Sequence, residues 1–497
     1  MKFLLLAQTD EATIEQRLGA ADYSYFFLLR AYAKVLSRIG DVLLLHGAAE
    51  ADPIHEQCLA QGERCVLLSF APPHKTPLGL ICPTVPVFAW EYPDIPGRIE
   101  ERCWLDDARN DWRYVLARTG RAITLSNHTA EAIRRSMGPD FPVVAIPSPI
   151  KSMTSPAGNV PFRTIATNTV LKVDASVVDS TRLGLDASGL NCLIEEDGTA
   201  FDSTDLDDLP KPPKQTTRAG PATDAYPAEV PATEKDDPAW AKTIDAGWNL
   251  PPARPTRISL QGIVYTTVLT PSAGRKNWED LVTAFCWTFR DRADVTLILK
   301  LAGTDLLLYH HQLLMLLTKM SPLKCRVIAI NGYLSDDHYV ALVDATTYYV
   351  NASLCEGLCL PLVEFLSEGV PAISPDNTAM SDYIADDLAF VVASYPGVPT
   401  AWPHGDIEVN RTSYHQLDWE SLTSAFRCSA DVARDEPQRY QRMSRRGREA
   451  MQAYCGADVV EAELRRFLCP DIPSPTTPAT GQSTDNVEAH QSTLDCA

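Results

Sequence analysis

The sequence predicts an α/β protein in which two domains are each built on a parallel sheet. In residues 1–150, and again in residues 257–469, short apolar runs alternate with amphipathic segments, which is typical of βα units. Between them, residues 206–256 are rich in Pro, Ala, Thr and Asp and have little apolar surface to bury, so we expect a disordered linker. The chain has 497 residues, 45% of them hydrophobic, which suffices for two cores.

The first domain begins with an apolar segment that we interpret as a buried strand, because polar residues follow it at once. Residues Tyr23–Ile39 are apolar at helical spacing and end at Gly40, which predicts a helix. Ser126 is placed to cap a second helix at Thr129–Met137. The strands expected in this domain are Lys2–Ala7, Asp41–Leu45, Cys65–Ser69, Val85–Ala89, Ala122–Leu125 and Val143–Ile146.

The second domain repeats the alternation of strands and helices. Its expected strands are Gly262–Val268, Val295–Lys300, Arg326–Ile330, Tyr348–Val350, Ala372–Ser374 and Phe390–Val392. Its expected helices are Asn277–Arg290, Asp305–Lys319, Ser335–Asp344, Pro361–Ser367, Met380–Ile384 and Trp419–Asp435. Residues 151–205 hold short β-like pieces and are assigned to an insert, and residues 470–497 to a disordered tail.

Charge and cysteine usage exclude several classes of function. A net charge of −20 opposes binding to a nucleic-acid backbone, which needs a basic face. The thirteen cysteines are scattered without a Cys-x-x-Cys pair, which argues against a zinc site and a disulfide framework and favours a reducing cytoplasm. No run of 18 apolar residues is present, so we expect no membrane-spanning helix.

The segment from Asn351 to Glu364 gives the strongest functional signal. It follows an expected strand, and Pro361 suits the first turn of a helix. Glu356 would then lie in the loop at the helix start and Glu364 on the first turns. The backbone N–H groups free to face an anion, at the positive end of the helix dipole, would be those of Gly357, Leu358 and Cys359.

Such an arrangement could hold a nucleotide sugar. One carboxylate would lie near a sugar ring, the other near ribose hydroxyls, and the loop amides would bind the phosphates between them. In the simpler alternative, Glu356 only complements the helix dipole and Glu364 is a solvated helix residue. Spacing alone does not decide between the two.

The segment from Gly332 to Ile384 resembles the nucleotide-binding half of the retaining glycosyltransferases of family 4, which have the GT-B fold. That family carries two glutamates separated by seven residues, which Glu356 and Glu364 match. Flanking family positions are matched by Ala352, Ser353, Gly369, Pro371 and Ile373. The likeness extends over residues 257–455 and reaches the first half in outline only. It implies two Rossmann-like domains that face a cleft, with C-terminal helices that pack back onto the first domain.

A basic pair opens the first expected helix of the second domain. In glycosyltransferase family 4, a lysine at the start of this helix neutralises the donor diphosphate. Lys276 occupies the position of that lysine. The family's arginine precedes that lysine by several residues, where this chain has Pro271, so the resemblance implies that Arg275 substitutes for it. Two fixed cations would stabilise the charge that develops on a leaving diphosphate. The alternative is a basic, solvated loop.

Two further pairs of residues in the second domain correspond to donor contacts in the family. Thr378 and Ala379 stand where the family has a Gly-Gly pair that touches the donor, so we expect a different sugar pocket. Thr378 could contact the donor or merely cap a helix. Gly332 and Tyr333 stand where the family lodges the nucleobase, with Tyr333 either stacking on the base or packing internally.

In the first domain the candidate residues are fewer. Gly19 lies where the family has a glycine-rich loop near the donor phosphates and the acceptor. Glu91 follows an expected strand at the carboxyl edge of the sheet, where ligands of open α/β sheets gather. It could bind sugar hydroxyls or complement a helix start. His128 lies at the edge of the same cleft or is a neighbour of the Ser126 cap.

The resemblance implies transfer of a hexose-type sugar from a nucleotide diphosphate donor to a hydroxyl of a glycan or a lipid-linked acceptor. The anomeric configuration would be retained, and no cofactor or metal would be needed. A nucleotide-sugar epimerase of the same fold and a non-catalytic sugar- or nucleotide-binding component remain alternatives. The five arginines within Arg439–Arg448 could bring the protein to anionic lipid at the inner face of the membrane, or form a solvated helix face.

Overall fold

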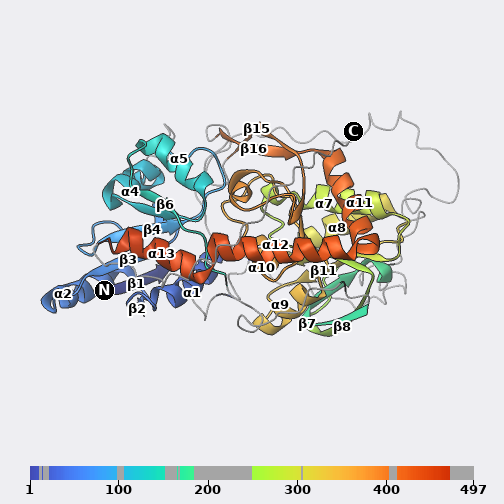
Figure 1. Ribbon diagram of the computed structural model, residues 1–497, viewed down its shortest axis with the longest axis horizontal. Coiled ribbons are helices and arrows are strands. Elements are labelled where there is room, and N and C mark those ends of the chain that lie inside the picture. Colours follow the sequence, from blue (N-terminus) through green and yellow to red (C-terminus); the bar gives the residue numbers. More distant parts are fainter. Residues whose placement is uncertain are drawn as a thin grey trace, which may run out of the picture.

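The computed structural model describes residues 1–9, 14, 19, 22–97, 106–150, 165, 168–183, 249–303, 306–401 and 411–470. Figure 1 shows two α/β domains side by side, the first in blue and cyan and the second in green to orange, with C-terminal helices in red along both. Each domain is built on a largely parallel sheet. The predicted α/β class, with two Rossmann-like domains in a GT-B arrangement, is therefore confirmed.

The first sheet consists of parallel strands in the order β2-β1-β3-β4-β5-β6. Its strands are β1 (Lys2–Ala7), β2 (Asp41–Leu44), β3 (Cys65–Phe70), β4 (Thr84–Phe88), β5 (Ala122–Thr124) and β6 (Val143–Ala145). The central strand β3 is buried along its whole length, as expected for a continuous apolar run with neighbours on both sides. The strands predicted for this domain are confirmed, with ends within one residue.

The described α-helices of the first domain are α1 (Ser24–Leu36), α2 (Ala51–Ala60), α4 (Trp112–Thr119) and α5 (Asn127–Met137). The predicted cap of α5 is confirmed, because Ser126 Oγ accepts the Thr129 N–H at 3.3 Å. Two of these helices, α2 and α4, were not predicted. The inner face of α2 is made of Ala51, His55 and Cys58 rather than large apolar residues, so its helical pattern is faint in the sequence.

The second sheet has the strand order β14-β13-β12-β9-β10-β11-β7-β8. Its parallel strands are β9 (Ile263–Leu269), β10 (Val295–Leu301), β11 (Arg326–Asn331), β12 (Tyr348–Val350), β13 (Ala372–Ser374) and β14 (Ala389–Val391), each within one residue of its predicted ends. An antiparallel hairpin of β15 (Ser394–Ala401) and β16 (Arg411–Leu417) lies apart from it.

Two antiparallel strands extend this sheet beyond the predicted domain boundary. β7 (Asn168–Asp179) pairs with β11, and β8 (Arg254–Gln261) pairs with β7. Part of the expected insert and the end of the expected linker therefore belong to the second domain, which is a correction. The alternation of buried Leu171, Val173 and Ala175 with exposed residues was the signal for β7. Apart from residues 165, 168–183 and 249–256, the insert and linker lie outside the described residues, as do residues 471–497 of the tail.

The described helices that cover the second sheet are α7 (Trp278–Phe289), α8 (Leu306–Met320), α9 (Asp336–Ala345), α10 (Leu360–Ser367) and α11 (Trp419–Asp435). The helix predicted at Met380–Ile384 is instead a short 3₁₀ helix, η8 (Thr378–Asp382). It starts at Thr378, whose φ of 48° no regular α-helix accommodates.

The C-terminal helices join the two domains. In Figure 1, α12 (Pro437–Cys455) runs along the second domain and α13 (Ala457–Leu468) lies over the first. Arg38 of the first domain donates to Asp458 at 2.8 Å, and the Ile150 N–H donates to the Cys455 carbonyl at 3.0 Å. The predicted return of these helices to the first domain is confirmed. None of the helices in the described part is both long and apolar enough to cross a membrane.

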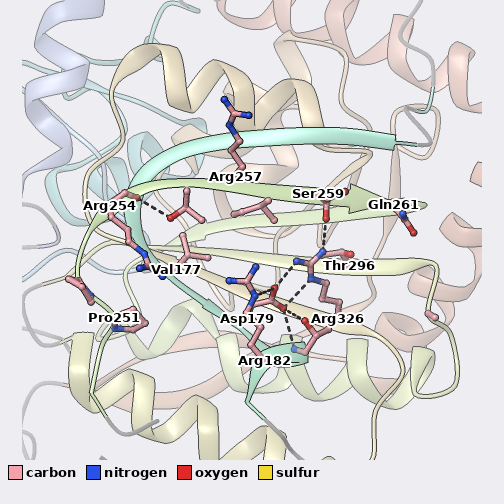
Figure 2. Close-up of a pocket in the computed structure, with 15 residues that line it drawn as sticks. Val177, Asp179, Arg182, Pro251, Arg254, Arg257, Ser259, Gln261, Thr296 and Arg326 are labelled. Atoms are coloured by element: carbon pink, nitrogen blue, oxygen red, sulfur yellow. Dashed lines mark hydrogen bonds and ion pairs between the residues drawn. The ribbon is translucent and has the colours of Figure 1, made fainter. Parts of the chain in front are cut away.

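The added strands are fixed to the second sheet by Asp179, which is 6% exposed (Figure 2). Its carboxylate accepts hydrogen bonds from Arg326 at 2.7 and 3.1 Å. Burial alone would raise the pKa of Asp179, but the bonds from Arg326 and Thr181 hold it below its ordinary value. A cavity of about 470 Å³ opens beside this pair. It lies at the amino ends of β10 and β11, because Thr296 and Arg326 line it.

We predict that Asp179→Asn lowers the free energy of unfolding by about 2 kcal/mol, because it removes the counter-charge of a largely buried arginine. Asp174→Asn, on the exposed face of the same strand, is the matched control and should change stability little. Urea denaturation measures both. Equal stability of the two variants would show that the ion pair does not anchor β7.

Candidate active site

The candidate site lies where the strand order of the second sheet reverses. Along the chain, β9 is followed by β10 and β11 on one side of it, whereas β12 and β13 lie on the other side. The loops that leave the carboxyl ends of β9 and β12 therefore diverge, and open α/β sheets bind ligands in the crevice between such loops. The loop after β9 carries Arg275 and Lys276, and the loop after β12 carries Glu356.

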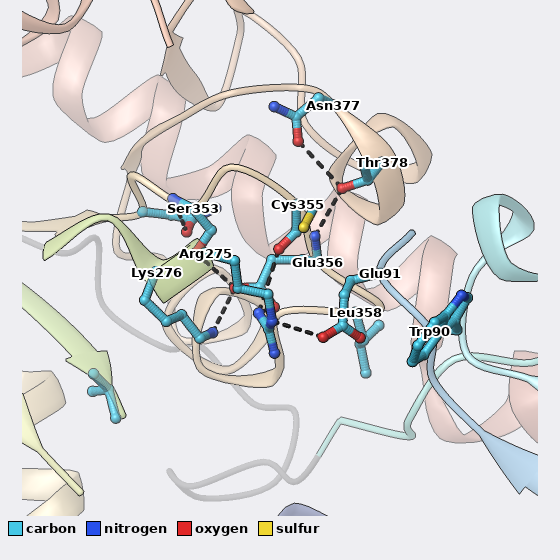
Figure 3. Close-up of polar contacts among 12 residues, drawn as sticks. Trp90, Glu91, Arg275, Lys276, Ser353, Cys355, Glu356, Leu358, Asn377 and Thr378 are labelled. Atoms are coloured by element: carbon cyan, nitrogen blue, oxygen red, sulfur yellow. Dashed lines mark hydrogen bonds and ion pairs between the residues drawn. The ribbon is translucent and has the colours of Figure 1, made fainter. Parts of the chain in front are cut away.

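Glu356 is the centre of this site. It is 3% exposed, and both of its carboxylate oxygens accept hydrogen bonds (Figure 3). Lys276 Nζ and Ser353 Oγ donate to Oε1 at 2.5 and 2.6 Å. Arg275 Nη1 donates to Oε2 at 2.8 Å. The structure thus brings together the three residues predicted to be catalytic, although their loops are far apart in the sequence.

Arg275 also connects this centre to the first domain. Its Nε lies 2.7 Å from Glu91 Oε1, so the guanidinium is held between carboxylates of both domains, as Figure 3 shows. The side chains of Arg275 and Glu91 are 22% and 16% exposed, which leaves their attraction little screened by water. Glu91 follows β4, so the carboxyl ends of both sheets face this site.

The charges of the site explain the pKa values of its groups. Burial alone would raise the pKa of Glu356, but Arg275 and Lys276 outweigh burial and lower it to about 2. Burial likewise disfavours the charged form of Arg275, yet Glu356 and Glu91 raise the pKa of Arg275 well above its ordinary value. Two cationic and two acidic side chains therefore balance one another at the junction of the domains.

Backbone strain concentrates around these residues. Among the described residues other than glycine, the four with positive φ are Asp22 (72°), Asn277 (51°), Cys359 (61°) and Thr378 (48°). Such conformations cost on the order of 1 kcal/mol each and persist where the surrounding structure enforces them, often at ligand sites. Asn277 directly follows Lys276, Cys359 precedes α10, and Thr378 contacts the Glu356 loop. This concentration favours a functional role for the site.

Glu364 has a different environment from Glu356. It lies on α10, partly exposed, and its Oε2 accepts a hydrogen bond from the Tyr339 hydroxyl of α9 at 2.8 Å. Tyr23 approaches from the first domain and lies near Thr270, the residue after β9. Burial raises the pKa of Tyr23, while the nearby charge of Lys276 opposes that rise. Neither tyrosine was predicted, because both positions depend on how helices pack and no local motif marks them.

The loop N–H groups predicted to face an anion donate no hydrogen bond to any described residue. None of the hydrogen bonds among described residues employs the N–H of Gly357, Leu358 or Cys359. Gly357 also touches the first domain. A Cβ at this position would lie 2.8 Å from both Ala89 Cβ and Trp90 N, so a larger residue would separate the domains.

Thr378 fixes the Glu356 loop. It is 8% exposed, and its Oγ1 accepts the Glu356 N–H at 2.9 Å and donates to Asn377 Oδ1 at 3.2 Å. It does not cap η8, because the N-cap residue of η8 is Asn377, whose side chain makes no cap bond. Of the two predicted alternatives, the helix cap is therefore excluded, and the hydroxyl is already engaged by the loop.

Gly332 and Tyr333 lie on the same edge of the sheet but apart from Glu356. They follow β11, and both are partly buried. β11 is separated from β12 by β9 and β10, which places the strand ends about 14 Å apart at the usual strand spacing. The φ of Gly332 is 101°, so the turn at this position favours glycine.

Gly19 and His128 lie at the same junction. A Cβ on Gly19 would be 2.4 Å from Gly303 Cα, so two backbone segments, one from each domain, pack directly against each other. His128 Nε2 lies 3.2 Å from the Glu91 carbonyl oxygen, and burial lowers the pKa of His128. It therefore supports the segment that carries Glu91.

The arginines of α12 mostly contact the protein itself. Arg446 binds Asp387 at 2.7 Å, and Arg448 donates to the Glu368 carbonyl at 3.1 Å. These bonds hold α12 against the second domain. Contact of Arg439–Arg448 with lipid stays a prediction.

No protein-family model and no curated protein matches the sequence. Among solved structures, the chain is similar to sucrose-phosphate synthase from Thermosynechococcus elongatus, with 11% identity and a TM-score of 0.48 over 94% of this chain and 98% of that one. It is also similar to HepE from Anabaena in complex with UDP and glucose, with 13% identity and a TM-score of 0.46 over 95% and 100%. Similarity to TarM from S. aureus is lower, with 8% identity and a TM-score of 0.42 over 82% and 55%. These values are too low to assign an activity.

Proposed function

We propose that this chain transfers a sugar from a nucleotide diphosphate donor to a hydroxyl acceptor, with retention of the anomeric configuration and without a metal. The observation that carries the proposal is the buried cluster of Arg275, Lys276 and Glu356 at the reversal of strand order. Buried charges that converge on such a crevice are a frequent mark of a functional site.

The donor would lie along the carboxyl edge of the second sheet. Its diphosphate would meet Arg275, Lys276 and the N–H groups of the loop before α10. The nucleoside would extend toward Gly332 and Tyr333, about 14 Å along the edge by strand spacing, which suits the length of a nucleotide. Glu364, on α10, would accept hydrogen bonds from the ribose hydroxyls.

The chemistry follows from the charges. As the bond between the anomeric carbon and the diphosphate oxygen breaks, negative charge grows on the diphosphate, where two preorganised cations stabilise it. The acceptor oxygen then bonds to the anomeric carbon on the same face, and its proton passes to the departing diphosphate. No protein base is required in this scheme. Glu356 holds Arg275 and Lys276 in place and is the nearest carboxylate to the positive charge that develops on the sugar.

The acceptor would enter from the first domain. Glu91 is the carboxylate of the first domain that pairs with Arg275. When Arg275 turns to the diphosphate, Glu91 is released from this pair and can bind a hydroxyl of the acceptor sugar. His128, bound to the Glu91 carbonyl, would keep that segment in position. A glycan or lipid-linked hydroxyl is the acceptor class that we propose.

The proposal is tested by incubating the purified chain with a panel of nucleotide sugars, with and without glycan acceptors, and analysing products by mass spectrometry. A new glycoside together with nucleoside diphosphate is expected, and nuclear magnetic resonance of its anomeric proton should show retention. Rearranged donor or free nucleotide without any glycoside would instead favour an epimerase. Intact donors throughout would contradict catalysis.

We predict that Glu364→Gln weakens binding of the free nucleoside diphosphate about tenfold, because one charged hydrogen-bond acceptor of the ribose is lost. The loss should appear mainly in KM, since this contact is the same before and during reaction. Glu279→Gln, on an exposed position of α7, is the matched control. Unchanged nucleotide affinity in Glu364→Gln would mean that this carboxylate binds Tyr339 and not the ribose.

A further inference from the structure

A cluster of soft metal ligands lies in the first domain. His55, Cys65 and Cys82 offer ligand atoms that all lie within 4.8 Å of one another. These side chains are 7%, 5% and 2% exposed. Cys58, 1% exposed, belongs to the same apolar cluster. Two thiols and one imidazole therefore converge inside the protein, and a third thiol lies in the same cluster.

The fold assembles this cluster from three elements. His55 and Cys58 are three residues apart on α2, which places both on its buried face. Cys65 is the first residue of β3, and Cys82 precedes β4 by two residues. The register of β3 and β4 pairs Leu67 with Thr84, so the two cysteines lie level with each other at the amino edge of the sheet. The candidate active site is at the opposite, carboxyl edge.

One polar atom of the cluster is unexplained by the described structure. His55 Nδ1 is buried and has no hydrogen-bond partner among the described residues. An unpaired buried nitrogen costs about 1–3 kcal/mol, so its presence points to a partner that is not part of the chain. The surroundings are otherwise apolar, with Leu4, Leu45 and Leu67 in contact. The backbone of Cys82 is fixed, because its N–H donates to Asp52 Oδ1 at 2.9 Å.

We propose that His55, Cys58, Cys65 and Cys82 bind one structural zinc ion. A set of three sulfurs and one imidazole nitrogen is typical of tetrahedral structural zinc sites. With Zn–S and Zn–N bonds of about 2.3 and 2.0 Å, neighbouring ligand atoms are about 3.5–3.8 Å apart. The ligand atoms of His55, Cys65 and Cys82 lie within 4.8 Å of one another and need only small movements to reach that geometry. The Cys58 side chain, which is outside that group, would have to turn toward them. Binding releases the three thiol protons, and the site carries a net charge of −1.

The site is structural because all of its ligands are buried and none is left open to a substrate. It ties α2 to β3 and to the turn before β4, and its loss would loosen this side of the first domain. The proposal is independent of the sugar-transfer function, since no ligand belongs to the candidate active site.

The test is the metal content of the full-length protein, purified under reducing conditions and measured by inductively coupled plasma mass spectrometry. We expect about one zinc ion per chain. Cys82→Ser and His55→Ala should each weaken zinc affinity by on the order of a hundredfold or more, and so lower the retained metal. The matched control Cys428→Ser, an exposed cysteine of α11, should keep it. When cobalt replaces zinc, the absorption spectrum of the wild type should show a thiolate-to-metal charge-transfer band, and this band should be weaker in Cys65→Ser.

Either of two results would overturn the proposal. One is wild-type protein that holds no zinc as purified and takes up none when zinc is supplied. The other is equal zinc content in Cys82→Ser and Cys428→Ser. If the ligand variants do not fold, a strong zinc chelator applied to the wild type decides instead. A fall in Tm that added zinc reverses supports the site, and an unchanged Tm after complete metal removal rejects it.

Discussion

Lys276→Ala is expected to lower kcat about a hundredfold, because one preorganised charge on the developing oxyanion contributes about 3 kcal/mol to the barrier. Lys276 is one of two cations at the reversal of strand order, and its ammonium is held in place by Glu356. Since its charge counts most when the diphosphate departs, the loss should fall on kcat more than on KM. Steady-state release of nucleoside diphosphate measures it.

The matched control is Lys319→Ala, an exposed lysine at the end of α8, which should keep wild-type turnover. Far-ultraviolet circular dichroism would confirm that both variants remain folded. Equal turnover in Lys276→Ala and Lys319→Ala would show that Lys276 does not stabilise the departing diphosphate.

Glu356→Gln should impair the chemical step without weakening nucleotide binding. The carboxylate accepts hydrogen bonds from Lys276, Arg275 and Ser353, and a neutral amide cannot balance the two cations. We expect kcat to fall about a hundredfold, because the two cations are no longer preorganised for the charge of the departing diphosphate and the sugar loses its nearest protein carboxylate. A free nucleoside diphosphate should bind as well as before or better, since it no longer competes with a carboxylate for the cations. Glu420→Gln, exposed on α11, is the control, and a loss of diphosphate binding in Glu356→Gln would contradict this role.

The same variant carries a pH signature. The pKa of Glu356 is lowered to about 2 from an ordinary value of 4.5, so its ionised form stabilises the folded state. This contribution is complete above pH 4.5 and is lost as the pH falls toward 2. Glu356→Gln should therefore be less stable than the wild type by about 3 kcal/mol at pH 7, and the difference should shrink between pH 4.5 and 2. Urea denaturation at several pH values tests the trend, and a constant difference would contradict it.

The periodicity of the sequence predicted the parallel strands of both sheets to within one residue, because buried parallel strands are continuous apolar runs with sharp ends. It failed for β7 and β8, which pair antiparallel at a sheet edge and expose one face. Their signal is an alternation among polar residues, which resembles that of a loop. The helix α2 was missed for a similar reason, since its buried face is small and polar.

The residues of the candidate site were predictable where a motif carries them, as with Glu356, Glu364 and Lys276. What the sequence could not predict is which of them touch. The contact of Arg275 with Glu91 depends on how the two domains meet, and that of Tyr339 with Glu364 on how α9 packs against α10. The ligand cluster at Cys65 was hidden for the same reason, because sheet register rather than spacing along the chain assembles it.

The most direct test of the central claim is calorimetric titration of nucleoside diphosphates into the wild type and the double variant Arg275→Ala/Lys276→Ala. If these two cations bind the donor diphosphate, at least one nucleoside diphosphate binds the wild type, and its affinity falls about a hundredfold or more in the double variant. Lys319→Ala should bind like the wild type. The same affinity in the double variant as in the wild type would place the donor site elsewhere and contradict the account.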